Sequence, residues 1–174
     1  MLLSLCVLSV TAILPPSVRI SPPLSSNSKR ASCVNNGLPI TLNGGNVMPY
    51  AKIYVIWYGN WIGNTGTTII PGFFASVGAS NWYASQLGYY GADGLYVMPN
   101  ISYVSSINDN YSMGKNLNYS SVDAIVSNAI VSSLLPYDSA GLYFVLGAAD
   151  VLSSDGFCTS FCGWHSADFL QVSE

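Results

Sequence analysis

The pattern of hydrophobic and polar positions predicts two strands that are buried on both faces. Residues 52–58 read Lys-Ile-Tyr-Val-Ile-Trp-Tyr, so they are β-branched or aromatic after the first position. An apolar run of this length, followed directly by Gly59 and Asn60, is typical of a fully buried strand. Residues 141–146 repeat the pattern as Gly-Leu-Tyr-Phe-Val-Leu, and residues 101–105 are expected to form a shorter strand.

The clearest helix is predicted between Ser120 and Pro136. Its apolar residues are Val122, Ile125, Val126, Ala129, Ile130 and Leu134. Their spacing of three and four places them on one stripe of a helix. Ser120 is the expected N-cap, Asp123 lies near the positive end of the helix dipole, and Pro136 blocks continuation. Residues 69–87 also have helical spacing, interrupted by Gly78, which predicts one broken helix or two short ones.

The order of these elements predicts the fold class. A strand, a helix, a strand, a helix and a strand follow one another, and parallel neighbours of this kind need crossover connections. We therefore expect an α/β (or α+β) fold with a mixed, partly parallel sheet and flanking helices. The chain has no internal repeat and no heptad run.

The N-terminus is expected to direct export. Residues 2–14 form an almost unbroken apolar run that ends at two prolines, which is typical of the hydrophobic region of a signal peptide. The run is shorter than the roughly 20 residues that cross a bilayer, so we expect no membrane anchor. The alternatives are a buried N-terminal strand and a misplaced start codon. We predict a signal peptide at 1–14, a Pro/Ser-rich linker at 15–37 and a folded domain at 38–174.

The composition supports an extracellular protein. Charged residues make up 7 % of the chain and the formal net charge is -3, whereas an average soluble domain is about 25 % charged. No basic patch is present for nucleic acid. Three Asn-x-Ser triplets mark candidate N-glycosylation sites at Asn100, Asn110 and Asn118. We expect a secreted glycoprotein with at least one of these sites modified.

Cysteines and the single histidine gather near the end of the chain. Cys158 and Cys162 are four residues apart and can form a local disulfide, which is the favoured interpretation for an exported chain. Either of them can instead pair with another cysteine, such as Cys33 or one that is missing from this chain. A zinc site formed by Cys158, Cys162 and His165 has suitable ligand types but only three ligands in an unusual spacing. A Cys-His nucleophilic pair is the weakest alternative, because no orienting acid is identifiable.

The remaining candidates for chemistry have ordinary structural explanations. His165 is expected to be a hydrogen-bonded structural residue beside a disulfide. Asp150 directly follows a strand, where α/β proteins place functional groups, but a cap on the following loop is the favoured interpretation. Aromatic pairs can stack on sugar rings, although most are expected in the core; they are Trp57-Tyr58, Trp61, Trp82-Tyr83 and Tyr89-Tyr90. No catalytic fingerprint and no cofactor motif is recognisable, so enzyme activity is left open, with a non-catalytic protein favoured.

Several motifs resemble those of one plant family. The segment Gly156-Phe157-Cys158-x3-Cys162-Gly163-x-His165 is similar to a segment of the EXORDIUM, or phosphate-induced protein 1, family. Further matches upstream, in the same order, are Gly44-Gly45-Asn46-Val47, Ile56-Trp57-Tyr58-Gly59, Trp82-Tyr83, Tyr89-Tyr90 and Asn110-Tyr111-Ser112-x-Gly114-Lys115-x-Leu117. The resemblance runs from about Gly44 to His165.

The resemblance implies a secreted cell-wall or apoplast protein that acts in growth and cell expansion. Its expected partners are a cell-wall glycan or an extracellular protein, with no cofactor. Family members continue past His165 with further cysteines, so the chain resembles an incomplete, N-terminal portion whose fold is truncated at the C-terminus. The alternative function is a secreted zinc-dependent hydrolase or a degenerate relative of one.

Overall fold

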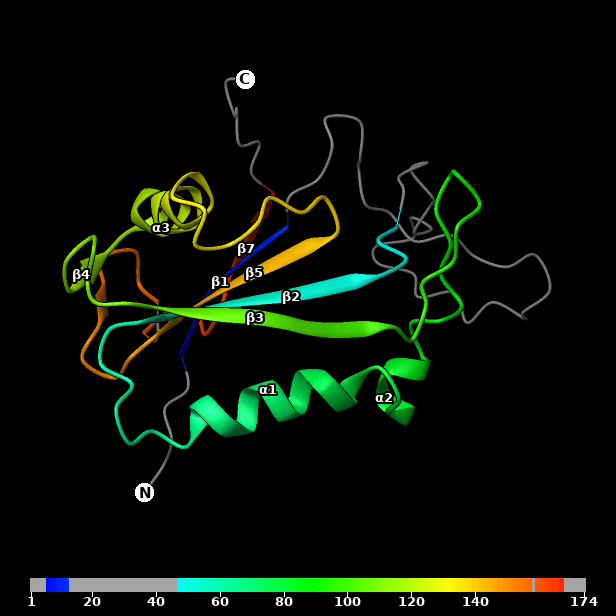
Figure 1. Cartoon of the computed structure of the whole chain (residues 1–174), viewed down its shortest axis with the longest axis horizontal. Helices are drawn as coiled ribbons and strands as arrows, with labels where there is room; N and C mark the ends of the chain where they lie inside the picture. Colours follow the sequence, from blue (N-terminus) through cyan, green and yellow to red (C-terminus); the bar gives the residue numbers. More distant parts are fainter. Residues whose placement is uncertain (1–5, 13–46, 158, 168–174) are drawn as a thin grey trace.

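The structure is a computed structural model that describes residues 6–12, 47–157 and 159–167 (Figure 1). Its helices are α1 (Gly66–Val77), α2 (Asn81–Ala84) and α3 (Tyr119–Val131). Its strands are β1 (Cys6–Ala12), β2 (Ala51–Tyr58), β3 (Ile101–Asp109), β4 (Asn116–Leu117), β5 (Gly141–Gly147), β6 (Leu152–Ser153) and β7 (His165–Ala167). In these ranges no helix has the length and apolar character needed to cross a membrane.

The larger sheet has the strand order β3-β2-β5-β1-β7. Strand β2 runs parallel to both of its neighbours, β3 and β5. Strand β1 is antiparallel to β5 and parallel to β7. Strands β4 and β6 form a separate parallel pair. This arrangement confirms the predicted α/β class with a mixed, partly parallel sheet.

Helices α1 and α3 cover opposite faces of the sheet (Figure 1). Alternate residues of β2 point to the two faces, as in any strand. Tyr54, Ile56 and Tyr58 belong to the core under α3, whereas Ile53, Val55 and Trp57 belong to the core under α1. Both sets are buried, which explains why residues 52–58 form a continuous apolar run rather than an alternating one.

The two helices that follow the parallel strands largely confirm the predicted pattern. The helical region after β2 is divided into α1 and α2, and the division falls at Gly78. A Cβ atom at Gly78 would lie 2.1 Å from the carbonyl oxygen of Pro99, so only glycine permits this approach. The expected N-cap of α3 is wrong. Asn118 caps the helix by accepting a hydrogen bond from the Ser121 amide at 2.8 Å, while the Ser120 hydroxyl donates to Asn118 Oδ1.

The N-terminal apolar run contributes β1 to the sheet. Cys6–Ala12 pairs with β5 along its length, with one irregularity between Val7 and Ser9. The sequence analysis gave an N-terminal strand as one alternative to a signal peptide, and this pairing is what that alternative predicts. Removal of residues 1–14 as a signal peptide stays a prediction, and the linker at 15–37 lies outside the described residues.

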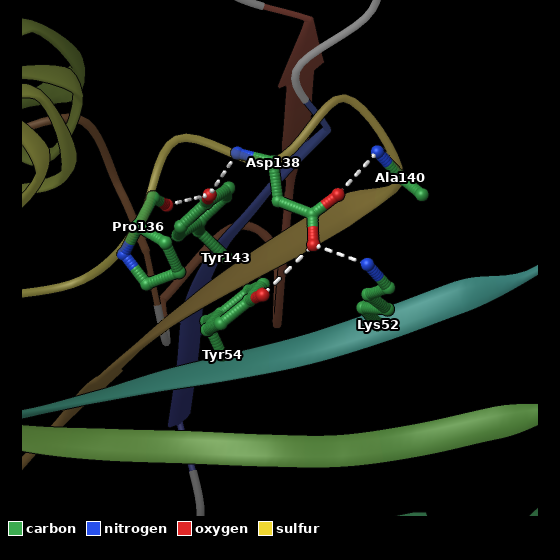
Figure 2. A network of polar contacts seen from close by, with 6 residues as sticks. All are labelled: Lys52, Tyr54, Pro136, Asp138, Ala140 and Tyr143. Carbon is green, nitrogen blue, oxygen red and sulfur yellow. Dashed lines mark hydrogen bonds and ion pairs between the residues drawn. The ribbon is translucent and has the colours of Figure 1, made fainter.

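A polar network joins the beginnings of β2 and β5 (Figure 2). The Asp138 carboxylate accepts hydrogen bonds from Lys52 Nζ at 2.9 Å, Tyr54 Oη at 2.8 Å and the Ala140 amide at 3.0 Å. The Tyr143 hydroxyl accepts from the Asp138 amide and donates to the Pro136 carbonyl. The rings of Tyr54 and Tyr143 stack with centroids 4.9 Å apart. These hydrogen bonds and the stacked rings hold the loop before β5 against the sheet.

Burial and hydrogen bonds set the ionisation of this network. Burial opposes the charge of Asp138, but the bonds from Lys52, Ala140 and Tyr54 outweigh it and lower the pKa of the carboxyl group below its ordinary 3.8. Burial, together with the neighbouring Asp138 carboxylate, raises the pKa of the Tyr54 hydroxyl. Burial also raises the pKa of Tyr143 to about 12. The network is therefore built around one carboxylate and two neutral tyrosines.

Candidate functional site

A cleft of about 580 Å³ opens at the carboxyl ends of β2 and β3. It is lined by Gly59, Asn60, Trp61, Ile62, Thr67, Asn108, Asn110 and Tyr111. The chain leaves β2 toward α1 on one face of the sheet and leaves β3 toward α3 on the other. Adjacent parallel strands whose connections diverge in this way leave a crevice, which is where open α/β sheets bind ligands. The cleft is therefore the candidate functional site.

Gly59 lets three loops meet at the base of this cleft. Its φ of +93° lies in the left-handed region that favours glycine. A Cβ atom there would lie 2.9 Å from Val151 Cγ2, 3.0 Å from Ala148 Cβ and 3.2 Å from the Tyr111 ring. These neighbours follow β5 and β3, so a side chain at position 59 would push the loops apart.

Trp61 forms a rigid wall of the cleft. Its indole Nε1 lies 3.1 Å from the Tyr58 carbonyl and 3.2 Å from the Leu146 carbonyl, and it donates to both. Its ring contacts Trp57 edge to face at 4.9 Å, and the residue is only 7 % exposed. The sequence analysis placed most of the aromatic pairs in the core, and this holds for Trp57, Tyr58 and Trp61, whereas Trp82 is 70 % exposed.

Tyr111 is clamped on the opposite side of the cleft. It has a φ of 61°, and its hydroxyl donates to Asp150 Oδ2 at 2.7 Å. Lys115 Nζ donates to the same carboxylate oxygen at 2.6 Å and lies 4.6 Å from the centroid of the Tyr111 ring. The ammonium group therefore lies over one face of the ring, and Tyr111 lines the cleft.

Asp150 serves as the anchor of that clamp. The hydrogen bonds from Lys115 and then Tyr111 lower the pKa of Asp150, and the same bond raises the pKa of Lys115. The amides of Val151 and Leu152 donate to backbone carbonyls instead. The expectation that Asp150 caps the following loop is therefore wrong: its carboxylate is used by two side chains from the loop after β3.

Tyr58 supports the same loop from below. Its buried hydroxyl donates to the Gly114 carbonyl at 2.7 Å and accepts from the Met113 amide at 2.9 Å. Burial raises the pKa of this hydroxyl, and the Met113 bond opposes the rise only in part. The last residue of β2 therefore fixes the loop that carries Tyr111 and Lys115.

Two amide side chains face the cleft without protein partners. Within the described ranges, the side chains of Asn108 and Asn110 make no hydrogen bond, and both residues are exposed. Asn60 Oδ1 accepts from the Ile62 amide at 3.1 Å, which shapes the loop after β2. None of the eight lining residues is charged. Side-chain amides offer both donors and acceptors, so this surface matches neutral, hydroxyl-rich molecules.

A smaller cleft of about 320 Å³ lies between β3 and the second half of α3. Its lining includes Asn108 and Asn110 again, together with Ile125, Asn128 and Leu134. The two asparagines therefore stand between the two clefts.

The structure separates the residues that the sequence grouped as candidate sites. Asn100 precedes β3, Asn110 lines both clefts and Asn118 caps α3. Cys162 is an exposed free thiol, and His165 is an exposed residue of β7. Cys33 and Cys158 lie outside the described residues, so the disulfide pairing stays a prediction.

The proposed zinc ligands are tested only in part. Among the residues that the structure places, no three His, Cys, Asp or Glu side chains come close enough to hold a metal ion. Cys158 belongs to the proposed set and is not among them, so that site also stays a prediction.

Sequence reasoning missed Asn60, Asn108 and Tyr111 as site residues. A signal was available, because Asn60 and Asn108 to Tyr111 stand at the ends of two strands predicted to be parallel. Polar residues in such positions meet at one edge of the sheet. The sequence analysis ended this strand at Ser105, four residues before the end of β3, so it did not place Asn108 to Tyr111 at a strand end.

Comparison with known proteins identifies the family. The family described as "Phosphate-induced protein 1 conserved region" matches residues 41–174. The chain belongs to this family. Two relatives from Arabidopsis thaliana are Protein EXORDIUM-like 5, 29 % identical over 131 residues, and Protein EXORDIUM-like 3, 28 % identical over 171 residues. No solved structure matches the chain.

The relatives are longer than this chain. The match to EXORDIUM-like 5 covers 70 % of this chain and 36 % of that protein, and the match to EXORDIUM-like 3 covers 91 % and 50 %. The chain thus spans half or less of the curated relatives it matches. The suspected resemblance is confirmed at the level of the family.

Proposed function

We propose that the chain is a secreted cell-wall protein that binds a neutral glycan in the carboxyl-end cleft and acts without catalysis. The observation that carries the proposal is the pair of unpartnered amides, Asn108 and Asn110, in an uncharged cleft. Sugar hydroxyls are both donors and acceptors, and so are side-chain amides. The aromatic side chains of Trp61 and Tyr111, which line the cleft, add apolar contact for the C–H groups of a sugar ring.

The position and rigidity of the cleft support binding. Ligand sites are concave, largely preformed and lined by a few polar groups among apolar ones. Trp61 is fixed by its indole bonds, and Tyr111 is fixed by Asp150. A preformed wall loses little conformational entropy when a ligand binds. The N-terminal apolar run, the sequons and the low charge support the extracellular location. Growth and cell expansion, which the family resemblance implies, would follow from binding at the wall.

Titration with oligosaccharides tests the binding. Isothermal calorimetry of the purified chain is expected to show saturable binding of neutral wall oligosaccharides, such as β-linked glucose or xylose oligomers, and weaker binding of an oligogalacturonate. Asn108→Ala should weaken neutral binding about fivefold, since a lost hydrogen bond is worth about 1 kcal/mol. Asn100→Ala, an exposed asparagine outside the cleft, is the matched control. Equal affinities of the two variants, or no binding of any neutral oligomer, would contradict the proposal.

Export is tested separately. The chain fused at its C-terminus to a fluorescent reporter should reach the wall space when expressed in plant cells. The same fusion lacking residues 1–14 should stay inside. Retention of the full-length fusion inside the cell would remove the cell-wall assignment and leave the binding result untouched.

A further inference from the structure

Asn110 stands apart from the other two sequon asparagines. It lines the carboxyl-end cleft and the smaller cleft between β3 and α3. Asn100 and Asn118 line neither of them. A group attached to Asn110 therefore changes access to both clefts, which a group on the other two asparagines does not.

The local geometry leaves the Asn110 amide available. Asn110 is exposed, directly follows β3 and has no side-chain partner in the described part of the chain. The Ser112 hydroxyl, the third position of the sequon, is exposed and donates to Asp109 Oδ2 at 2.6 Å. The Asn118 side chain, by contrast, accepts from both the amide and the hydroxyl of Ser121 at the start of α3. These bonds tie Asn118 Oδ1 to the start of α3, whereas the Asn110 side chain makes no hydrogen bond within the described residues and is set apart by its place on both clefts.

We propose that Asn110 carries an N-linked glycan that covers the carboxyl-end cleft and limits the binding of wall glycans there. This proposal rests on the proposed function. The modification forms a bond between Asn110 Nδ2 and the anomeric carbon of an activated oligosaccharide donor. The bond from that carbon to the pyrophosphate leaving group breaks, and Nδ2 loses one proton.

The attached sugar and the free ligand compete for the same groups. Both present hydroxyls, and the Asn60 and Asn108 side chains line the cleft beside the attachment point. A tethered ligand on a short linker has an effective concentration in the millimolar range. The apparent affinity of a free sugar falls by the ratio of this concentration to the dissociation constant of the tethered sugar, so a tethered sugar that binds with a constant of about 0.1 mM weakens free-sugar binding about tenfold. The glycan on Asn110 acts as a built-in competitor.

The test uses the full chain from two sources, an exporting eukaryotic cell and a bacterium that adds no glycan. Mass spectrometry of the peptide with Asn110 reads the modification directly. Ser112→Ala removes the acceptor sequence and keeps the Asn110 amide, whereas Ser112→Thr keeps both. Ser112→Asn also removes the acceptor sequence and leaves the cleft-lining Asn110 in place, so it serves if Ser112→Ala folds poorly, and Asn100→Gln controls for loss of a glycan elsewhere.

The proposal expects a difference that depends on the source. From the exporting cell, Ser112→Ala should bind the neutral oligosaccharide at least about tenfold more tightly than wild type, Ser112→Thr or Asn100→Gln. From the bacterium, wild type and Ser112→Ala should bind equally. An unmodified Asn110, or equal binding by modified and unmodified protein, would overturn the inference.

Hydrogen exchange separates failure of this inference from failure of the proposed function. The amides of residues 59–62 border the cleft, so a glycan on Asn110 should slow their exchange relative to Ser112→Ala from the same cells. If no form binds sugar but this protection is present, the glycan covers the cleft and the proposed ligand is wrong. If Asn110 is modified and the protection is absent, the covering glycan is wrong whatever the ligand.

Discussion

The polar groups at the amino ends of the parallel strands are hydrogen-bonded to one another, whereas those at the carboxyl ends are exposed to a cleft. At the amino end, one carboxylate, Asp138, accepts from Lys52, Tyr54 and Ala140, so the charge is surrounded by donors. At the carboxyl end, Asn108 and Asn110 face a cleft with no protein partner within the described ranges. The same three strands therefore use one end to hold the fold closed and leave exposed amides at the other end, where a ligand can replace the water that hydrates them.

Removing the carboxylate at the amino end should give the largest loss of stability. Asp138→Ala leaves the buried Tyr54 hydroxyl and the Ala140 amide without their acceptor. Unsatisfied buried groups cost roughly 1–3 kcal/mol each, so we expect the free energy of unfolding to fall by about 3 kcal/mol. Urea denaturation measures the change. Asp150→Ala at the carboxyl end is the control, and its midpoint should stay close to that of wild type because Asp150 is exposed.

The floor of the cleft should be the next most sensitive position. Gly59→Ala combines an unfavourable positive φ with contacts of 2.9 and 3.0 Å to Val151 and Ala148. We expect a loss of about 2 kcal/mol and weaker sugar binding, since the loops must move apart. Gly63→Ala has a φ of 73° and no atom within 4 Å of the added Cβ, so it measures the backbone strain alone. Equal losses at both positions would mean that the loops do not meet tightly at Gly59.

Acid should weaken the amino end selectively. The pKa of Asp138 is lowered in the folded protein, so the unfolded chain binds more protons in this pH range. The contribution of Asp138 is therefore complete above about pH 4, its unfolded value, and is lost as the pH falls through the folded pKa. Denaturation midpoints from about pH 5 to pH 2 should fall more steeply for wild type than for Asp138→Asn. Parallel curves would show that the carboxylate is not stabilised as the contacts indicate.

The smallest effect is expected at the exposed clamp. Tyr111→Phe keeps the ring but removes its bond to Asp150, so the loop after β3 should become more mobile. We expect stability to change little and sugar affinity to fall about threefold, because the cleft wall is less preorganised. Hydrogen exchange of the loop and calorimetric titration measure the two effects. Tyr119→Phe is a control with an exposed tyrosine outside the cleft lining.

The sequence by itself determined most of the sheet and its helices. The apolar runs at 52–58 and 141–146 became the buried strands β2 and β5, because a strand covered on both faces must be apolar at nearly every position. The stripe from Val122 to Ile130 became the buried face of α3 for the same reason. Its start was misplaced by two residues, since Asn118 and Ser120 are both good caps and only the geometry decides between them.

Only the tertiary structure decided the site. The sequence drew attention to cysteines, a histidine and Asp150, because these residue types carry chemistry. The cleft is instead formed mainly by residues 59–62 after β2 and by residues 108–111 at the end of β3, which are far apart along the chain. They meet because β2 and β3 are parallel neighbours whose connections leave toward opposite faces. Hydrophobic periodicity predicts which faces of a strand or helix are buried. Strand order decides which distant segments become neighbours, and the local sequence does not encode strand order.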